Sequence, residues 1–211
     1  MSDTITAPPR VLLKLDLGCG ANKRQGFLGV DNLDFEGVDF KVDLAEDAWK
    51  GPLTTTPKGK YKPWPWENDS VEEAHCSHCL EHFTGLERVH VLNELWRVLI
   101  PGGRCQVIVP HFASCRAYGD FTHKWPPVGE FFFYYLSREW RLGNPAKGVG
   151  PNAPHNDIMH NPDGYKCDFE ATWGYSMHPT LTVKNAEFQQ FAFQFYKESV
   201  QDIIATLTAR K

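Results

Sequence analysis

The chain has 211 residues, 42% of them hydrophobic and 23% charged, which is typical of one globular domain and excludes a wholly disordered chain or a coiled coil. The net charge of −4 disfavours a uniformly basic nucleic-acid-binding protein. No segment approaches the roughly 20 apolar residues of a membrane span, and residues 1–10 lack a signal-peptide core. We therefore expect a cytoplasmic protein without a membrane partner, whose six cysteines are reduced thiols.

Short apolar runs in the first third of the chain predict buried strands rather than helices. The predicted strands are residues 11–17, 27–31, 38–43 and 71–79. Between the last two, residues 44–70 are rich in glycine and proline and predict an irregular loop.

A helix is predicted to follow the fourth strand. Thr84 and Glu87 have the spacing of a capping box. Apolar residues then recur at helical spacing as far as Leu99, and Pro101-Gly102-Gly103 is expected to end the helix. Residues 104–110 predict a fifth strand, so strand, helix and strand form a βαβ unit with parallel strands.

The remaining residues predict further elements that complete the sheet. Residues 167–177 alternate between apolar and polar side chains, which is typical of a half-buried strand. The other predicted elements are a helix over residues 130–140, a loop over 144–165, a helix over 185–196 and a terminal strand over 203–208. We expect an α/β fold with a mostly parallel central sheet and an antiparallel C-terminal strand, forming a single domain over residues 11–211 after a flexible N-terminus, residues 1–10.

The sharpest local signal is Gly18-Cys19-Gly20 at the end of the first strand. Glycines at such a turn let a ligand approach the backbone closely, and parallel α/β sheets bind ligands at the carboxyl ends of their strands. The third glycine of the dinucleotide fingerprint is absent, which argues against an NAD-dependent oxidoreductase. A plain tight turn is the alternative.

Aspartates follow the next two strands. Asp31 is placed to accept both hydroxyls of a ribose, and Asp43 lies one strand further out. Strand-end aspartates are also good turn formers, but their succession after Gly18-Cys19-Gly20 favours a nucleotide site.

These segments together resemble a known family. LDLGCG, GVD, VDL, PWPWENDSVEEAHCSHCLEHF and ELWRVLIPGG occur in the order typical of class I S-adenosylmethionine-dependent methyltransferases, and more narrowly of small methyltransferase domains with an S-H-x-L-E-H segment. The resemblance covers about residues 11–125. It implies a Rossmann-like fold, S-adenosylmethionine as cofactor, and residues 112–166 as a substrate-side cap.

The resemblance also implies roles for individual residues. Gly18, Cys19 and Gly20 would line the methionine part of the cofactor, and Asp16 would brace their loop. Asp31 would bind the ribose, and Asp43 and Leu44 would flank the adenine. Ser77 and His78 would border the sulfonium and the acceptor.

The chain departs from the family pattern in its first crossovers. Eleven positions separate Gly20 from Asp31, fewer than the dozen or more residues of a parallel crossover. We expect the first helices to be shortened or missing, one side of the sheet to be thinly covered, and the helix N-terminus near the cofactor's carboxylate to be lost. Lys14, Lys23 or Arg24 could supply that charge.

The segment from His75 to His82 contains ligand types for zinc, including Cys76 and Cys79. No second Cys-x-x-Cys or His-x-x-x-His pair accompanies it, and in a strand the two thiols would point to opposite faces. We therefore predict no metal site.

Beyond the fifth strand lies a cluster of His111, Asp120, Thr122 and His123, and the resemblance implies that its Asp-x-Thr-His element lies at the substrate side of the cleft. His111, Asp120 and His123 are candidates for acid–base chemistry, together with His78. His123 or His111 could act as a base, oriented by Asp120, if the acceptor must lose a proton. A purely structural role for His123 is an equal alternative.

The predicted function is methyl transfer from S-adenosylmethionine to an oxygen, nitrogen or carbon acceptor, with a small-molecule acceptor favoured. Nucleic acid is disfavoured because no amino-methyltransferase or cytosine-C5 motif is present. The rival prediction is a non-catalytic methyltransferase-like binding or scaffold protein. A homo-oligomer is left open.

Overall fold

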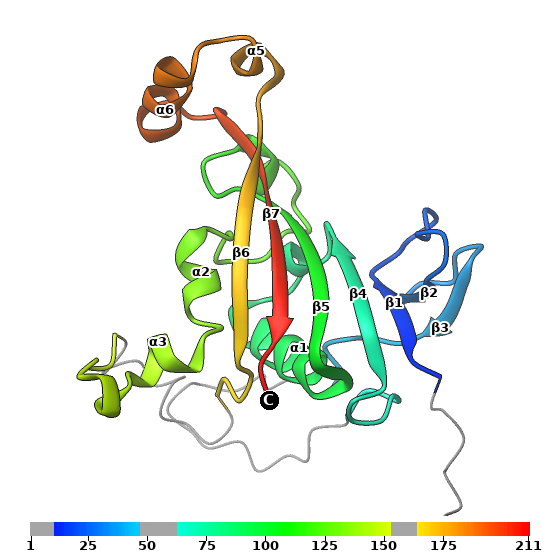
Figure 1. Ribbon diagram of the computed structural model, residues 1–211. Helices are drawn as coiled ribbons and strands as arrows, with labels where there is room; N and C mark the ends of the chain where they lie inside the picture. Colours follow the sequence, from blue (N-terminus) through cyan, green and yellow to red (C-terminus); the bar gives the residue numbers. More distant parts are fainter. Residues whose placement is uncertain (1–10, 47–62, 153–163) are drawn as a thin grey trace, which may run out of the picture.

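A computed structural model describes residues 11–46, 63–152 and 164–211 (Figure 1). Its centre is a seven-stranded sheet with the strand order β3-β2-β1-β4-β5-β7-β6. Strand β7 runs antiparallel to both of its neighbours, and the other pairs of strands are parallel. The strands are β1 (Leu13–Leu17), β2 (Leu28–Asp31), β3 (Val38–Lys41), β4 (Val71–Ser77), β5 (Leu99–Pro110), β6 (Phe169–Met177) and β7 (Val200–Ala209).

The mostly parallel Rossmann-like sheet with an antiparallel C-terminal strand is therefore confirmed. The expected flexible N-terminus, residues 1–10, lies outside the described residues, as do 47–62 of the expected loop and 153–163 of the expected cap. The α-helices are α1 (Gly85–Val98), α2 (Glu130–Tyr134), α3 (Arg138–Leu142), α5 (Pro179–Thr182) and α6 (Ala186–Phe195), and the 3-10 helices are η1 (Leu80–His82), η2 (Cys115–Ala117) and η3 (Pro145–Lys147).

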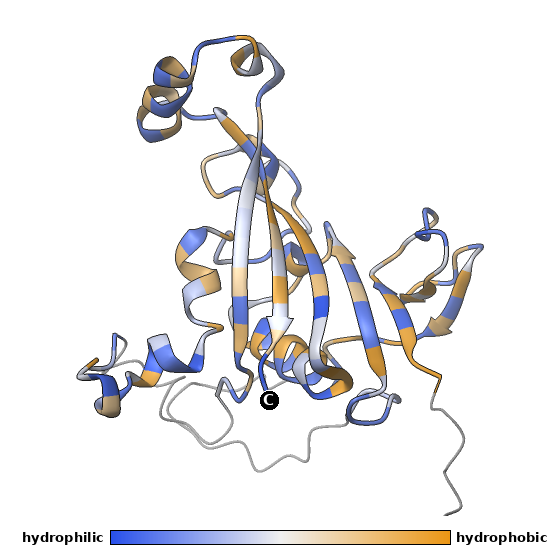
Figure 2. Cartoon of the chain, in the orientation of Figure 1, coloured by the Kyte–Doolittle hydropathy of each residue, from blue (hydrophilic) through white to orange (hydrophobic). Residues whose placement is uncertain are grey.

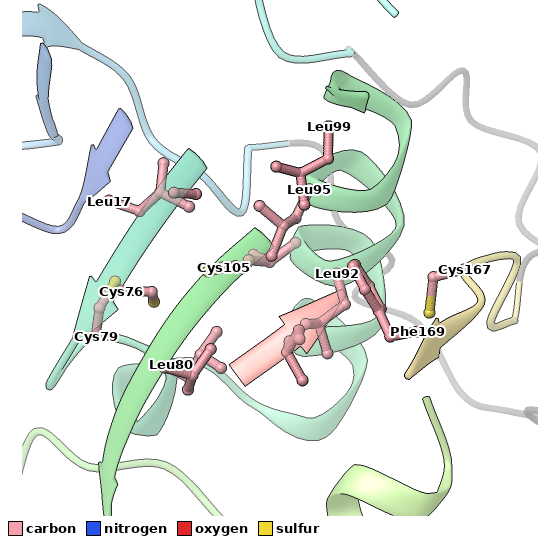
Figure 3. Packing of buried hydrophobic residues seen from close by; sticks show 14 of the residues in the cluster. Leu17, Cys76, Cys79, Leu80, Leu92, Leu95, Leu99, Cys105, Cys167 and Phe169 are labelled. Carbon is pink, nitrogen blue, oxygen red and sulfur yellow. The ribbon is translucent and has the colours of Figure 1, made fainter. Parts of the chain in front are cut away.

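Helix α1 begins at the predicted capping box. The Thr84 hydroxyl accepts a hydrogen bond from the Glu87 backbone N–H at 3.3 Å, and the Glu87 carboxylate accepts one from the Thr84 N–H at 2.8 Å. The helix then buries its apolar stripe, including Leu92 and Leu95, against β4 and β5 (Figure 3).

Replacing the cap tests how much this helix start contributes to stability. We expect Thr84→Ala to lower the free energy of unfolding by about 1 kcal/mol, because one backbone N–H loses its acceptor. Urea denaturation measures the change, and Thr84→Ser, which keeps the hydroxyl, is the control. Equal stability of Thr84→Ala and the unaltered chain would show that the cap contributes nothing.

The two faces of the sheet differ in chemistry. Hydrophobic and hydrophilic residues alternate along the central strands (Figure 2). Residues in register across neighbouring strands point to the same side, and one such row packs against the core: Leu17, Cys76, Val107, Ala205 and Trp173. The adjacent row is polar and faces the other side: Asp16, His75, Gln106, Thr206 and Thr172. Parallel sheets are ordinarily apolar on both faces because helices cover both. The single apolar face therefore indicates a sheet that packs against helices on that face.

The missing crossover helices explain the polar face. The chain joins β1 to β2, and β2 to β3, through turns without a helix, so the expected shortening is confirmed. The β1–β2 loop instead folds back on the polar row. The Arg24 N–H donates to Asp16 Oδ2 at 2.7 Å, and the ring of Phe27 meets that of His75 edge-on at 6.5 Å.

Two predicted elements differ most from the structure. Strand β5 begins at Leu99, five residues earlier than expected, because Gly102 at φ +76° lets the chain turn directly from α1 into the sheet. The predicted helix over residues 130–140 is two short helices. It breaks after Tyr134, and α3 starts anew where the Ser137 hydroxyl accepts a hydrogen bond from the Trp140 N–H.

The segment between β6 and β7 carries α5 and α6 beyond the end of the sheet, at the top of Figure 1. Within the described ranges, no helix combines the length and the apolar character that crossing a membrane requires.

Candidate active site

A cavity of about 500 Å³ lies where β1, β2 and β3 end. Residues far apart in the sequence meet there, from the β1 turn to the segment after β5. Five predicted site residues line it: Gly18, Asp31, Asp43, Leu44 and His78. Thr122, from the predicted cluster after the fifth strand, lines it as well. The lining residues that the sequence analysis did not single out for this cavity are Asn32, Leu33, Phe35, Val42, Cys79, His82 and Phe83.

The glycine turn forms one wall of the cavity and is fixed by close packing. Gly18 has φ +66°, its N–H donates to Val30 O at 2.8 Å, and a Cβ there would lie 2.5 Å from Cys79 Sγ. Gly20 has φ +52°, but a Cβ there would meet nothing within 4 Å. Both residues have left-handed backbone, which favours glycine, but only at Gly18 would a side chain also clash with a neighbour.

This contrast gives a matched pair of variants. We expect Gly18→Ala to lose about 1–3 kcal/mol of stability through overpacking against Cys79, in addition to about 1 kcal/mol for left-handed backbone. Gly20→Ala should lose only the second amount. Thermal or urea unfolding of both proteins measures the difference. Equal losses would mean that the turn moves away from Cys79 without cost.

Asp31 connects the glycine turn to the end of β2. Its Oδ2 accepts a hydrogen bond from the Gly20 N–H and its Oδ1 from the Leu33 N–H, both at 2.9 Å. A carboxylate offers about four acceptor positions, so Asp31 keeps capacity for two further donors. Asp43 similarly accepts from the Ala45 N–H at 2.9 Å through Oδ1.

Other predicted cofactor residues lie in or beside the turn but do not line the cavity. Asp16 is buried and bonds to His75 Nδ1 at 2.8 Å as well as to the Arg24 N–H. Cys19 is also buried, and this burial raises the pKa of its thiol. Asp16, Cys19, Gly20 and Ser77 are not among the residues that line the cavity.

The three cations that the sequence analysis considered for the cofactor's carboxylate have other partners. Lys14 pairs with Glu73 at 2.9 Å, and Lys23 pairs with Asp39 at 2.9 Å. Arg24 donates to Gln106 Oε1 at 3.1 Å on the polar face of the sheet. None of the three lines the cavity.

The other end of the cavity is built by η1, directly after β4. His78 has φ +50°, unusual for a residue other than glycine, and its N–H donates to Ile108 O at 2.8 Å. Its Nδ1 lies 3.2 Å from Glu81 Oε1, and this hydrogen bond raises the pKa of His78, while partial burial acts in the opposite direction.

The turn at His78 also overturns one expectation about the cysteines. Cys76 and Cys79 were expected on opposite faces of a strand, but β4 ends at Ser77 and the chain turns. The two side chains therefore lie close together in the core (Figure 3), and the neighbouring Cys79 thiol, with burial, raises the pKa of Cys76.

A loop after β5 completes this end of the cavity. Thr122 Oγ1 donates to Asp120 Oδ1 at 2.6 Å and lies 3.1 Å from His82 Nδ1. The hydrogen bonds from Thr122 lower the pKa of Asp120. The ring of His123 meets that of His82 edge-on at 4.8 Å. Two of the predicted catalytic residues, Asp120 and His123, thus adjoin the cavity through Thr122 and His82.

His111 lies in a different network. It is buried, its Nδ1 accepts from the Ala113 N–H, and its Nε2 lies 3.0 Å from Glu130 Oε1. The Tyr175 hydroxyl donates to the same carboxylate oxygen at 3.1 Å. The structure does not bring His111 to the cavity that His78 lines.

Comparison with known proteins finds a matching family model and solved structures with a similar fold. Residues 15–107 match the family model described as "Methyltransferase domain". Among solved structures, the chain is similar to a SAM-dependent methyltransferase from Archaeoglobus fulgidus, with 15% identity and a TM-score of 0.53 over 94% of this chain and 86% of that one. It is also similar to 1,6-didemethyltoxoflavin-N1-methyltransferase from Burkholderia thailandensis, with 14% identity and a TM-score of 0.49 over 96% of this chain and 72% of that one. No curated protein matches the chain in sequence.

The Archaeoglobus likeness supports the fold, and the family model identifies the domain. The matched residues run from β1 into β5 and so include the strands whose ends form the cavity. The chain therefore contains a segment, residues 15–107, that matches a methyltransferase-domain family model, within a fold similar to that of the Archaeoglobus fulgidus methyltransferase.

Proposed function

We propose that the chain methylates a small-molecule acceptor on oxygen, nitrogen or carbon, and that one cavity holds cofactor and acceptor together. The observation that carries this proposal is the composition of that cavity. Strand-end residues Asp31 and Asp43 lie at one end, and His78, His82 and Thr122 complete it from later in the sequence.

The cavity residues fit the parts of S-adenosylmethionine. Asp31, with acceptor capacity left after its two backbone bonds, would bind the ribose hydroxyls. Leu33, Val42 and Leu44 offer apolar contact to the adenine, and the Asp43 carboxylate, which uses Oδ1 for Ala45, would accept from its amino group. The methionine part would lie along the turn at Gly18.

The chemistry needs positioning more than acid–base help. S-adenosylmethionine supplies a methyl group activated by its positively charged sulfur. As the acceptor atom bonds to the methyl carbon, the carbon–sulfur bond breaks and its electron pair stays on sulfur. The protein contributes by holding the reacting atoms in line and by excluding water. His78 and His123, with Asp120, would orient the acceptor at the end of the cavity that contains Thr122.

A small-molecule acceptor is supported by the cavity and by the charge. The cavity volume of about 500 Å³ is within the usual range for small-ligand sites, and the chain has a net charge of −4. We propose that residues 112–166 act as the cap that selects the acceptor, since Thr122 from this segment lines the cavity.

Calorimetric titration with S-adenosylmethionine and S-adenosylhomocysteine tests the cofactor end. Micromolar binding, about −8 kcal/mol, is expected, and turnover on a panel of hydroxyl, amine and carbon acids then tests the acceptor class. Failure to bind either ligand would overturn the proposal. Tight binding without turnover on any class would favour a binding or scaffold protein instead.

A further inference from the structure

We propose that Glu81, His82 and His123 bind a divalent transition-metal ion at the acceptor end of the cavity. One ligand atom from each of the three side chains lies within 4.8 Å of the other two. Glu81 and His82 are consecutive in η1, and His123 comes from the loop after β5. His82 also lines the cavity, so an ion held here would face the bound acceptor.

Hydrogen bonds fix the protonation of the His82 ring. The Thr122 hydroxyl gives its one proton to Asp120 at 2.6 Å, so it can only accept from His82 Nδ1, which lies 3.1 Å away. His82 therefore carries its proton on Nδ1 and leaves the Nε2 lone pair free. Metal-binding histidines characteristically donate their other ring N–H to an oxygen in this way.

His123 is arranged in the same way by the backbone. Its Nδ1 lies 3.3 Å from the Ala117 carbonyl oxygen, which can only accept. The proton is therefore on Nδ1, and Nε2 is again the free nitrogen. The nearest carboxylate oxygen to this nitrogen, Asp120 Oδ2, is 3.9 Å away, beyond hydrogen-bond distance.

Glu81 supplies the second, independent observation. Its side chain is buried, with 5% of the residue exposed. Oε1 is held by His78 Nδ1 at 3.2 Å, but Oε2 has no hydrogen-bond partner among the described residues. A buried carboxylate oxygen without a partner is costly. A cation bound by this oxygen would remove that cost.

The donor set selects the kind of ion. Two imidazoles and one carboxylate suit zinc and its first-row neighbours better than magnesium or calcium, which prefer all-oxygen ligands. Three protein ligands leave coordination positions open, as in catalytic zinc sites. Resting on the proposed function, the ion would hold an acceptor oxygen beside the methyl group and lower the pKa of its hydroxyl, which favours oxygen acceptors.

The test is metal binding by the purified full-length chain after removal of metals with a chelator. We expect calorimetry with Zn²⁺ to show one ion per chain, and Co²⁺ to give a visible absorption band upon binding. Glu81→Gln and His123→Gln should each weaken Zn²⁺ binding by at least about tenfold. Thr122→Val, which removes the hydroxyl that orients His82 and donates to Asp120, should weaken it by about 10–100-fold, whereas Thr122→Ser, which keeps the hydroxyl, should bind Zn²⁺ normally.

Two controls distinguish this site from Zn²⁺ bound elsewhere on the chain and from a loss of folding. His178→Gln changes a histidine at the start of α5, outside the cluster, and should bind Zn²⁺ normally. Every variant is also titrated with S-adenosylmethionine, which reports whether the protein is folded and whether the proposed cofactor site is intact. Zn²⁺ binding is measured without cofactor, so the two results are independent. The inference is overturned if the unaltered chain binds no Zn²⁺. It is equally overturned if Zn²⁺ binding survives Glu81→Gln and His123→Gln, whether or not Cys79→Ser abolishes it.

Discussion

Replacing Asp31 by alanine should lower the affinity for S-adenosylmethionine about 100-fold or more. The carboxylate is expected to accept both ribose hydroxyls, and hydrogen bonds to a charged group contribute about 1.5–3 kcal/mol each. Losing two of them costs about 3 kcal/mol or more, and each 1.4 kcal/mol is about a factor of ten. The variant also frees the Gly20 and Leu33 N–H groups that Asp31 binds, which loosens the turn itself.

Calorimetric titration of three proteins distinguishes these effects. Asp34→Ala removes the same charge from an exposed position in the loop that follows β2 and should bind the cofactor normally. Asp31→Asn keeps one acceptor oxygen and should lose less affinity than Asp31→Ala. Unchanged affinity in Asp31→Ala would mean that the ribose binds elsewhere. An equal loss of affinity in Asp34→Ala would mean that the loss comes from the change in net charge and not from hydrogen bonds to the ribose.

The position of Asp31 could be predicted because it depends on local sequence. A short apolar run followed by glycines or an aspartate predicts both a strand and the residue at which it ends. Parallel strands bring their carboxyl ends to the same edge of the sheet. Gly18, Asp31 and Asp43 meet at the cavity for this reason.

The acceptor end could be predicted only in part because it depends on contacts across the sequence. His82 and Thr122 are 40 positions apart and are joined by one hydrogen bond of 3.1 Å. Nothing in the spacing of either residue indicates this contact. Cys76 and Cys79 were wrongly predicted to lie on opposite faces of a strand. Their contact depends on the left-handed backbone of His78, which a histidine in the sequence does not predict.

The polar face of the sheet was only partly anticipated. The short crossovers predicted thin cover, and alternation was recognised in β6. The same alternation is present in β4, where Glu73 and His75 interrupt Ala74 and Cys76, and in β5, where Gln106 separates Cys105 from Val107. Because parallel strands are usually apolar on both faces, these polar residues indicate a sheet covered by helices on one face.

The buried arginine of α1 should be the main support of the acceptor end. The Arg88 side chain is only 1% exposed, and this burial lowers the pKa of its guanidinium. Nε donates to Leu80 O at 2.8 Å, Nη1 to Pro126 O at 2.5 Å and Nη2 to Lys124 O at 3.4 Å. One side chain thus connects η1 to the loop that carries Thr122 and His123.

We therefore expect Arg88→Met to lower the free energy of unfolding by about 3 kcal/mol or more, because backbone carbonyls lose their donors in a buried place. The same change should weaken Zn²⁺ binding, since it releases Glu81 and His82 on one side and His123 on the other. Urea denaturation and Zn²⁺ calorimetry on the folded protein measure the two effects.

Arg141→Met is the matched control. Arg141 is also buried, at 2% exposed, and donates to the carbonyls of Tyr135, Tyr165 and Cys167, none of which belongs to the metal cluster. It should lose comparable stability while still binding Zn²⁺ normally when folded. If both variants retain Zn²⁺ affinity, Arg88 stabilises the fold without positioning the site. If both lose it, the site depends on overall stability and not on the connection that Arg88 makes.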